Sequence, residues 1–160
     1  MPKWFLRLTE ALTKLQTSSV DEFVSIGDGS YFADNNDPMF AYGHVKYMAA
    51  LWVSSMSRQH PNIRFVTVSP GSTSGTNVAN DLNLLMRILF AVIGPALLPL
   101  IGLMHTLKEG ARRYVKVIND ESYDSGAFYA SQAPILTGPL LNQGTIFADL
   151  NNETFQDNAN

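Results

Sequence analysis

The chain contains no cysteine, and only 16% of its 160 residues are charged. The lack of cysteine excludes disulfides, thiolate metal sites and a cysteine nucleophile, and it fits a reducing compartment such as the cytoplasm. The three histidines share no metal-ligand spacing, so we expect no metal site. The formal net charge of −3 gives no long-range attraction for nucleic acid, and we expect no nucleic-acid partner.

Long runs that are both apolar and free of charge are scarce, and residues 88–104 form one, because no charged side chain interrupts them. The run is at the short limit for a membrane-spanning helix, and Gly94, Pro95 and Pro99 break it into pieces. We therefore favour an apolar flap over 77–105. A contact with a membrane surface through 88–104 stays open as the alternative.

The remaining pattern predicts an α/β fold, because 46% hydrophobic residues can bury a core and helical and strand patterns alternate. The expected elements are helix 3–16, strand 23–26, helix 39–58, strand 63–68, the flap 77–105, a helix after Thr106 and strand 126–130. A strand, a long helix and a strand form a βαβ crossover, which implies parallel pairing. We expect 140–160 to be a loosely held polar tail.

Two of the helix starts carry local signals. Asp37 can accept hydrogen bonds from free backbone N–H groups, and Pro38 suits the first helical turn because its missing N–H costs nothing there. Thr106 and Glu109 have the spacing of a capping box. The apolar side chains of the helix that follows fall on one face: Ala111, Tyr114, Val115 and Ile118.

Tyr42 and Lys46 are four residues apart on predicted helix 39–58, so they lie on one helical face, one turn from each other. A neighbouring ammonium group favours the phenolate form of a tyrosine, which makes such a pair a general acid and base. About one chain in five of this composition would contain the spacing by chance, so the spacing alone is weak evidence.

The surroundings of this pair strengthen its functional interpretation. A predicted strand lies just upstream, and Pro70 and Gly71 follow the predicted strand 63–68. In an open parallel sheet, ligands bind beyond the carboxyl ends of the strands. We therefore expect Ser25, Tyr42 and the loop 69–76 to meet at one rim of the sheet.

The segment 41–76, AYGHVKYMAALWVSSMSRQHPNIRFVTVSPGSTSGT, resembles the active-site helix, following strand and proline-glycine loop of the short-chain dehydrogenases/reductases. The preceding LTEALTKLQ and EFVSIGDGS resemble the helix and strand before them. Residues 87–118 resemble the substrate flap and next helix of the retinol-dehydrogenase-like members. The resemblance covers most of residues 3–130 and implies a Rossmann-type fold with a doubly wound parallel sheet.

The resemblance implies an NAD- or NADP-dependent oxidoreductase that transfers hydride between nicotinamide and a carbonyl or alcohol substrate, an apolar one given the flap. Tyr42 would exchange the proton, and Lys46 would hydrogen-bond the nicotinamide ribose. Ser25 would bind the substrate oxygen, with Ser30 or a lost hydroxyl as the alternatives. The cofactor-binding residues would be Tyr42, Lys46, Pro70, Gly71, Thr73 and Thr76.

The chain departs from the family because it contains no glycine-rich dinucleotide fingerprint, G-x-x-x-G-x-G. The resemblance therefore implies a partial Rossmann-type domain over 1–139 that lacks the N-terminal dinucleotide-binding βαβ units, and we expect the isolated chain to be a poor enzyme. The rival interpretation is a non-catalytic remnant that serves as a binding module, membrane-associated through 88–104. Dimers of the family pack helix 39–58 against its mate, so a homodimer through this helix also stays open.

Overall fold

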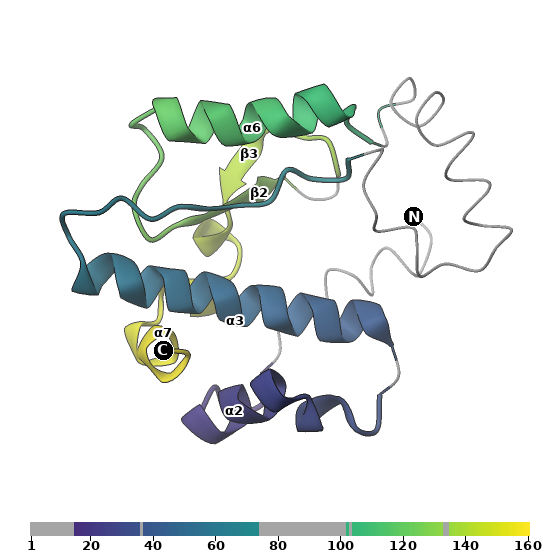
Figure 1. Cartoon of the computed structure of the whole chain (residues 1–160), viewed down its shortest axis with the longest axis vertical. Helices are drawn as coiled ribbons and strands as arrows, with labels where there is room; N and C mark the ends of the chain where they lie inside the picture. The colour runs from purple at the N-terminus through teal and green to yellow at the C-terminus, as the bar shows by residue number, and fades with distance from the viewer. Residues whose placement is uncertain (1–14, 36, 74–101, 103, 133–134) are drawn as a thin grey trace, which may run out of the picture. The chain divides into compact units, whose positions relative to one another are not determined.

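The computed structural model describes residues 15–35, 37–73, 102, 104–132 and 135–160 (Figure 1). It divides into a first unit, made of residues up to Thr67 with Ser125–Ala127 and Gln143–Asn160, and a second unit, made of Val68–Asp124 and Phe128–Asn142. Nearly all of the predicted helix 3–16, most of the flap 77–105 and the candidate cofactor residue Thr76 lie outside the described residues.

The strand predicted over 23–26 is wrong, because these residues lie in the α-helix α2, Val20–Asp28. The side chain of Ser19 caps this helix by accepting a hydrogen bond from the backbone N–H of Glu22, and Gly29 ends it with a φ of 87°. Phe23 and Ile26 are three residues apart and buried on the same helical face. The capping signals at both ends outweigh the strand propensity of the apolar run between them.

The long helix α3, Pro38–Gln59, confirms the helix predicted over 39–58, and it begins at the expected proline. It packs against α2. The one-turn 3-10 helix η1, Ser30–Phe32, follows α2, and its aromatic rings contact Phe40 and His44 of α3. Its buried side chains include Tyr47, Leu51 and Ser55. The element before α3 is a helix rather than a strand, so the strand–helix–strand crossover predicted through α3 is also wrong.

A small three-stranded sheet has the strand order β1-β2-β3. Its members are β1, Thr67–Val68, β2, Phe128–Ser131, and β3, Leu140–Asn142. β2 and β3 are antiparallel, with Tyr129 opposite Asn142. β1 and β2 run parallel, since the N–H of Ser69 donates to the carbonyl oxygen of Tyr129 at 2.8 Å and that of Thr67 to Ala127 at 3.1 Å.

The parallel pair and the helices confirm the α/β class. The strand predicted over 126–130 is confirmed as β2, whereas only the last two residues of the strand predicted over 63–68 are in β1. The chain between β1 and β2 contains the helix α6, Leu107–Asn119, so the parallel connection runs through α6 instead of α3.

Helix α6 begins as the capping box predicts, because the Thr106 side chain accepts from the N–H of Glu109 at 3.3 Å. Its buried residues are Gly110 and Val117, while the predicted apolar face is exposed. A Cβ at Gly110 would lie 2.7 Å from the Oγ1 atom of Thr73. The missing side chain of this glycine therefore lets α6 approach the segment after β1.

The segment 140–160 is not the loosely held tail that the sequence predicts. It forms β3, the 3-10 helices η3, Gln143–Thr145, and η4, Ala148–Asn151, and the helix α7, Glu153–Asn158. Helix α7 lies against α3 (Figure 1). Polar residues of this segment hold it in place: Asn152 caps α7, and the Asn158 amide donates a hydrogen bond to the carbonyl oxygen of Ser18 at 2.8 Å.

Candidate functional site

Tyr42 and Lys46 lie on one exposed face of α3, as their spacing predicts. The Nζ atom of Lys46 is 5.4 Å from the centroid of the Tyr42 ring, and the residue Tyr42 is 54% exposed. The ammonium group therefore sits over the phenol ring while the phenol stays accessible to a ligand. Chemically, an exposed phenol beside an ammonium group offers a hydroxyl that can donate or accept a proton.

His44 lies between these two residues in the sequence but points into the protein. Its residue is only 2% exposed, and its ring lies 4.2 Å from the Phe40 ring, centroid to centroid. Its Nδ1 atom is 2.9 Å from the carbonyl oxygen of Phe40, which can only accept, so Nδ1 carries the proton. Tyr31 and Phe32 complete the aromatic surroundings of the ring. His44 is therefore a core residue.

Tyr47, the next tyrosine of α3, provides a contrast with Tyr42. It is 8% exposed, and burial, followed by the charge of Asp149, raises its pKa well above the usual value for a phenol. A phenol in this position does not titrate near neutrality. Of the two tyrosines of this helix, Tyr42 is the exposed one.

The candidate substrate-binding serines are placed by α2 and η1 rather than by the end of a strand. The hydroxyl of Ser25 donates to the carbonyl oxygen of Glu22 at 2.7 Å, within its own helix. Ser30 begins η1, and its backbone N–H donates to the Asp28 carboxylate at 2.8 Å. The predicted strand 23–26 is a helix in the structure. Neither hydroxyl therefore lies at the end of a strand, where the prediction placed the substrate.

The candidate cofactor residues Pro70, Gly71 and Thr73 belong to the second unit, after β1. Gly71 has a φ of +76°, and a Cβ there would lie 2.4 Å from the carbonyl oxygen of Leu136. The hydroxyl of Thr73 donates to the carbonyl oxygen of Gly71 at 3.2 Å, and Thr73 is buried. The proline-glycine loop is therefore a tightly packed turn that only glycine fits.

Arg113 of α6 contacts this loop and is a residue that the sequence reasoning missed. Its guanidinium group donates to the carbonyl oxygen of Pro70 at 3.3 Å and to the hydroxyl of Ser131 at 2.7 Å. It also donates to the carbonyl oxygens of Thr137 and Gly138. Burial lowers the pKa of Arg113. The available sequence signal was its position three residues after the buried Gly110, which directs it inward.

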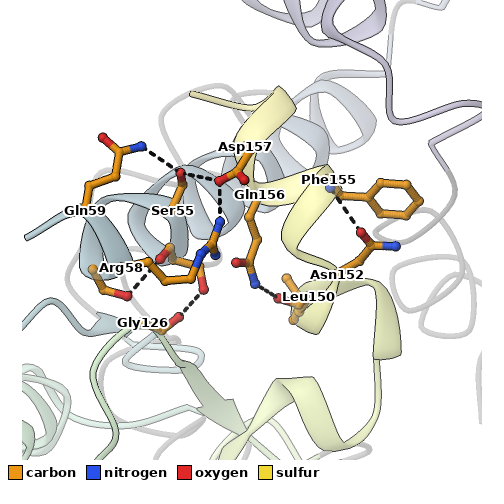
Figure 2. A network of polar contacts seen from close by, with 11 residues as sticks. Ser55, Arg58, Gln59, Gly126, Leu150, Asn152, Phe155, Gln156 and Asp157 are labelled. Carbon is orange, nitrogen blue, oxygen red and sulfur yellow. Dashed lines mark hydrogen bonds and ion pairs between the residues drawn. The ribbon is translucent and has the colours of Figure 1, made fainter. Parts of the chain in front are cut away.

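A second polar network ties α7 to α3 in the first unit (Figure 2). The buried hydroxyl of Ser55 donates to the Asp157 carboxylate at 2.8 Å, and Arg58 forms an ion pair with the same carboxylate. Gln59 donates to the oxygen of Ser55 at 3.1 Å. A serine and a carboxylate meet here, but Ser55 has no exposed surface from which to attack a substrate, so the network is structural.

Other kinds of site are not found in the part of the chain that the structure describes. Within it, no group of three or more histidine and acidic side chains could hold a metal ion. No helix in the same ranges has both the length and the apolar character needed to cross a membrane. Residues 88–101 and 103, which carry most of the uncharged run, lie outside these ranges.

The chain was also compared with known proteins. A scan against models of protein families finds no match to it, and a search of curated proteins finds none either.

Proposed function

We propose that this chain carries the nicotinamide-binding and catalytic part of an NAD(P)-dependent oxidoreductase of the short-chain dehydrogenase/reductase type. The observation that carries the proposal is the placement of the Lys46 ammonium over the ring of the exposed Tyr42. The sequence resemblance over 41–76 and the α/β architecture with a parallel strand pair support it, and a Rossmann-type domain is part of the same proposal.

The chemistry follows from the two side chains. When bound, the nicotinamide supplies or takes a hydride at carbon. In reduction of a carbonyl, Tyr42 donates its phenolic proton to the substrate oxygen, and Lys46 stabilises the phenolate that results. The alcohol leaves, and solvent returns a proton to the phenolate. In oxidation the same phenolate accepts the proton of the alcohol.

The proline-glycine turn lies in the second unit, and the sequence resemblance is what supports a cofactor-binding role for it. Pro70, Gly71 and Thr73 form a turn after β1 with a fixed shape, because Leu136, Ser131 and Arg113 fill the space beside Gly71 and the Thr73 hydroxyl donates to the carbonyl oxygen of Gly71. In this proposal they hold the nicotinamide end of the cofactor. The proposed activity includes no site for the adenine half, because the sequence contains no glycine-rich fingerprint.

Saturation-transfer NMR with NAD and NADP, each at about millimolar concentration, tests the proposal, because weak binding of half a cofactor lies in that range. We expect transfer to the nicotinamide protons of at least one of them. The signal should be lost in Lys46→Ala and kept in Lys108→Ala, which removes an exposed lysine from α6 instead. Absence of transfer from the unaltered chain, or an unchanged signal in Lys46→Ala, would contradict the proposal and favour a non-catalytic binding module.

A further inference from the structure

The guanidinium group of Arg113 connects three segments of the second unit that are far apart in the sequence. It reaches from α6 to the loop after β1 at Pro70, to the end of β2 at Ser131, and to the loop before β3 at Thr137 and Gly138. The acceptors are three backbone carbonyl oxygens and one hydroxyl. A charged donor strengthens each of these hydrogen bonds and offsets its burial.

Arg113 has used both of its terminal nitrogen atoms on the protein. One terminal nitrogen serves Pro70 and Ser131, and the other serves Thr137 and Gly138. Its neighbour Arg112 instead lies on the exposed side of α6 and pairs with Glu109. Arg113 is therefore suited to fix the protein backbone rather than to bind an anionic ligand.

The loop held by Arg113 has little freedom at the peptide that joins Pro70 to Gly71. The oxygen of this peptide accepts from Arg113 at 3.3 Å, and its N–H donates to the hydroxyl of Ser69 at 3.4 Å. A planar peptide contacted at both ends has a fixed orientation. Gly71 has a positive φ in this turn, and a Cβ there would meet the carbonyl oxygen of Leu136, the hydroxyl oxygen of Ser131 and the guanidinium group of Arg113.

We propose that Arg113 is a positioning residue that holds the Pro70–Gly71 turn in the shape that receives the nicotinamide end of the cofactor. The inference rests on the proposed function and extends it to a residue outside the segment that carries the Tyr-Lys pair. Arg113 acts through the turn and does not touch the ligand. Its loss lets the Pro70–Gly71 peptide reorient, so that binding of the nicotinamide end at the turn weakens.

The test compares four variants of the full chain: Arg113→Gln, Arg113→Lys, Arg112→Gln and Val117→Ala. The first reading is the amide resonance of Gly71 without ligand, and the second is the affinity for nicotinamide mononucleotide in an NMR titration. Arg113→Gln should shift the Gly71 resonance and weaken the mononucleotide about tenfold, the loss expected when hydrogen bonds to a charged group are removed. Arg113→Lys should restore part of the Gly71 resonance position and part of the affinity, because lysine keeps the charge but lacks the two terminal nitrogen atoms of the guanidinium group.

The other two variants are controls. Arg112→Gln removes a charge from the exposed side of the same helix, and Val117→Ala destabilises α6 by removing part of a buried side chain. Neither control variant should shift the Gly71 amide resonance or change the affinity for nicotinamide mononucleotide. If Val117→Ala weakens the mononucleotide as much as Arg113→Gln does, Arg113 is merely stabilising and the inference is wrong.

The two measurements, the Gly71 amide resonance and the affinity for the mononucleotide, distinguish failure of this inference from failure of the proposed function. An unchanged Gly71 resonance in a folded Arg113→Gln variant overturns the inference, whatever the chain binds. If the unaltered chain does not bind the mononucleotide, the proposed function fails, and the Gly71 resonance still decides whether Arg113 holds the turn. Should Arg113→Gln fail to fold, Ser131→Ala removes one of its acceptors and should shift Gly71 in the same direction by a smaller amount.

Discussion

The buried hydroxyl of Ser55 donates a 2.8 Å hydrogen bond to the Asp157 carboxylate, 102 positions further along the chain. This contact lies where α7 meets the last turns of α3 (Figure 2). The carboxylate also receives Arg58, so a neutral and a charged donor share one acceptor. The two donors differ in exposure, and the difference predicts which of them stabilises the packing of α7.

Ser55→Ala should lower the free energy of unfolding of the first unit by about 1–2 kcal/mol, because it deletes a buried hydrogen bond and leaves the partner in place. Arg58→Gln should cost less than about 1 kcal/mol, since exposed ion pairs are screened by solvent. Urea unfolding followed by tryptophan fluorescence measures both. A larger loss in Arg58→Gln than in Ser55→Ala would show that the ion pair, and not the buried bond, attaches α7.

The carboxylate of Glu22 predicts an acid-sensitive step in the first unit. Burial raises its pKa, but hydrogen bonds from the backbone N–H groups of Thr17, Gln16 and Ser18 outweigh burial and leave the pKa below its ordinary value of 4.5. A depressed carboxyl pKa contributes stability above the unfolded value, and this stability is lost as pH falls through the folded value.

Glu22→Gln should therefore lower the free energy of unfolding by about 1–2 kcal/mol at pH 7, and the difference from the unaltered chain should shrink below about pH 4.5. Urea midpoints measured from pH 7 down to pH 3 test this. Asp21→Asn is the control, because Asp21 is exposed in the same helical turn and should cost less than about 1 kcal/mol. A difference that stays constant across the acid range would show that Glu22 stabilises α2 by shape alone.

Two glycines with the same backbone conformation predict different costs for an added methyl group. Gly71 has a φ of +76° and Gly29 a φ of +87°, so alanine is strained at both. A Cβ at Gly71 would also meet Leu136 and Ser131, whereas at Gly29 it meets no atom of the described residues within 4 Å. Gly29→Ala should cost about 1 kcal/mol and Gly71→Ala at least about 2 kcal/mol, measured by thermal unfolding. Equal costs would mean that the loop around Gly71 yields freely.

The Tyr42 and Lys46 variants separate folding from chemistry. Both side chains are exposed, so Tyr42→Phe and Lys46→Ala should each change the free energy of unfolding by less than about 0.5 kcal/mol. Tyr42→Phe should keep the saturation-transfer signal from the cofactor and abolish proton transfer, because only the hydroxyl is lost. Lys46→Ala should lose the signal, because lysine is the residue that would bind the ribose. Equal loss of cofactor binding in both variants would refute this division of roles.

The sequence predicts those elements whose signals are local. Pro38 and the Thr106 capping box mark the starts of α3 and α6, and the structure confirms both. The helix α2 was missed because the apolar residues around Phe23 were weighed by strand propensity. The Ser19–Glu22 pair has the spacing of a capping box, and it decides the conformation of this segment.

The candidate functional residues also differ in whether a local sequence signal predicts them. The shared face of Tyr42 and Lys46 follows from the helical period alone, so the sequence suffices to predict it. The role of Arg113 depends on carbonyl oxygens, which every residue carries and no sequence motif marks. The packing of α7 also has no sequence motif, because Asn152 and Asn158 are polar residues whose hydrogen bonds are to backbone groups.

Helix α3 assigns its two sides to different tasks, with His44, Leu51 and Ser55 turned inward and Tyr42 and Lys46 turned outward. Mutation can therefore erase the reactive groups while circular dichroism and melting temperature stay the same. A well-folded preparation of this chain is therefore no evidence for the proposed activity, because loss of either exposed side chain leaves the fold intact. Only a measurement of proton or hydride transfer distinguishes a chain that has the proposed activity from a folded chain that lacks it.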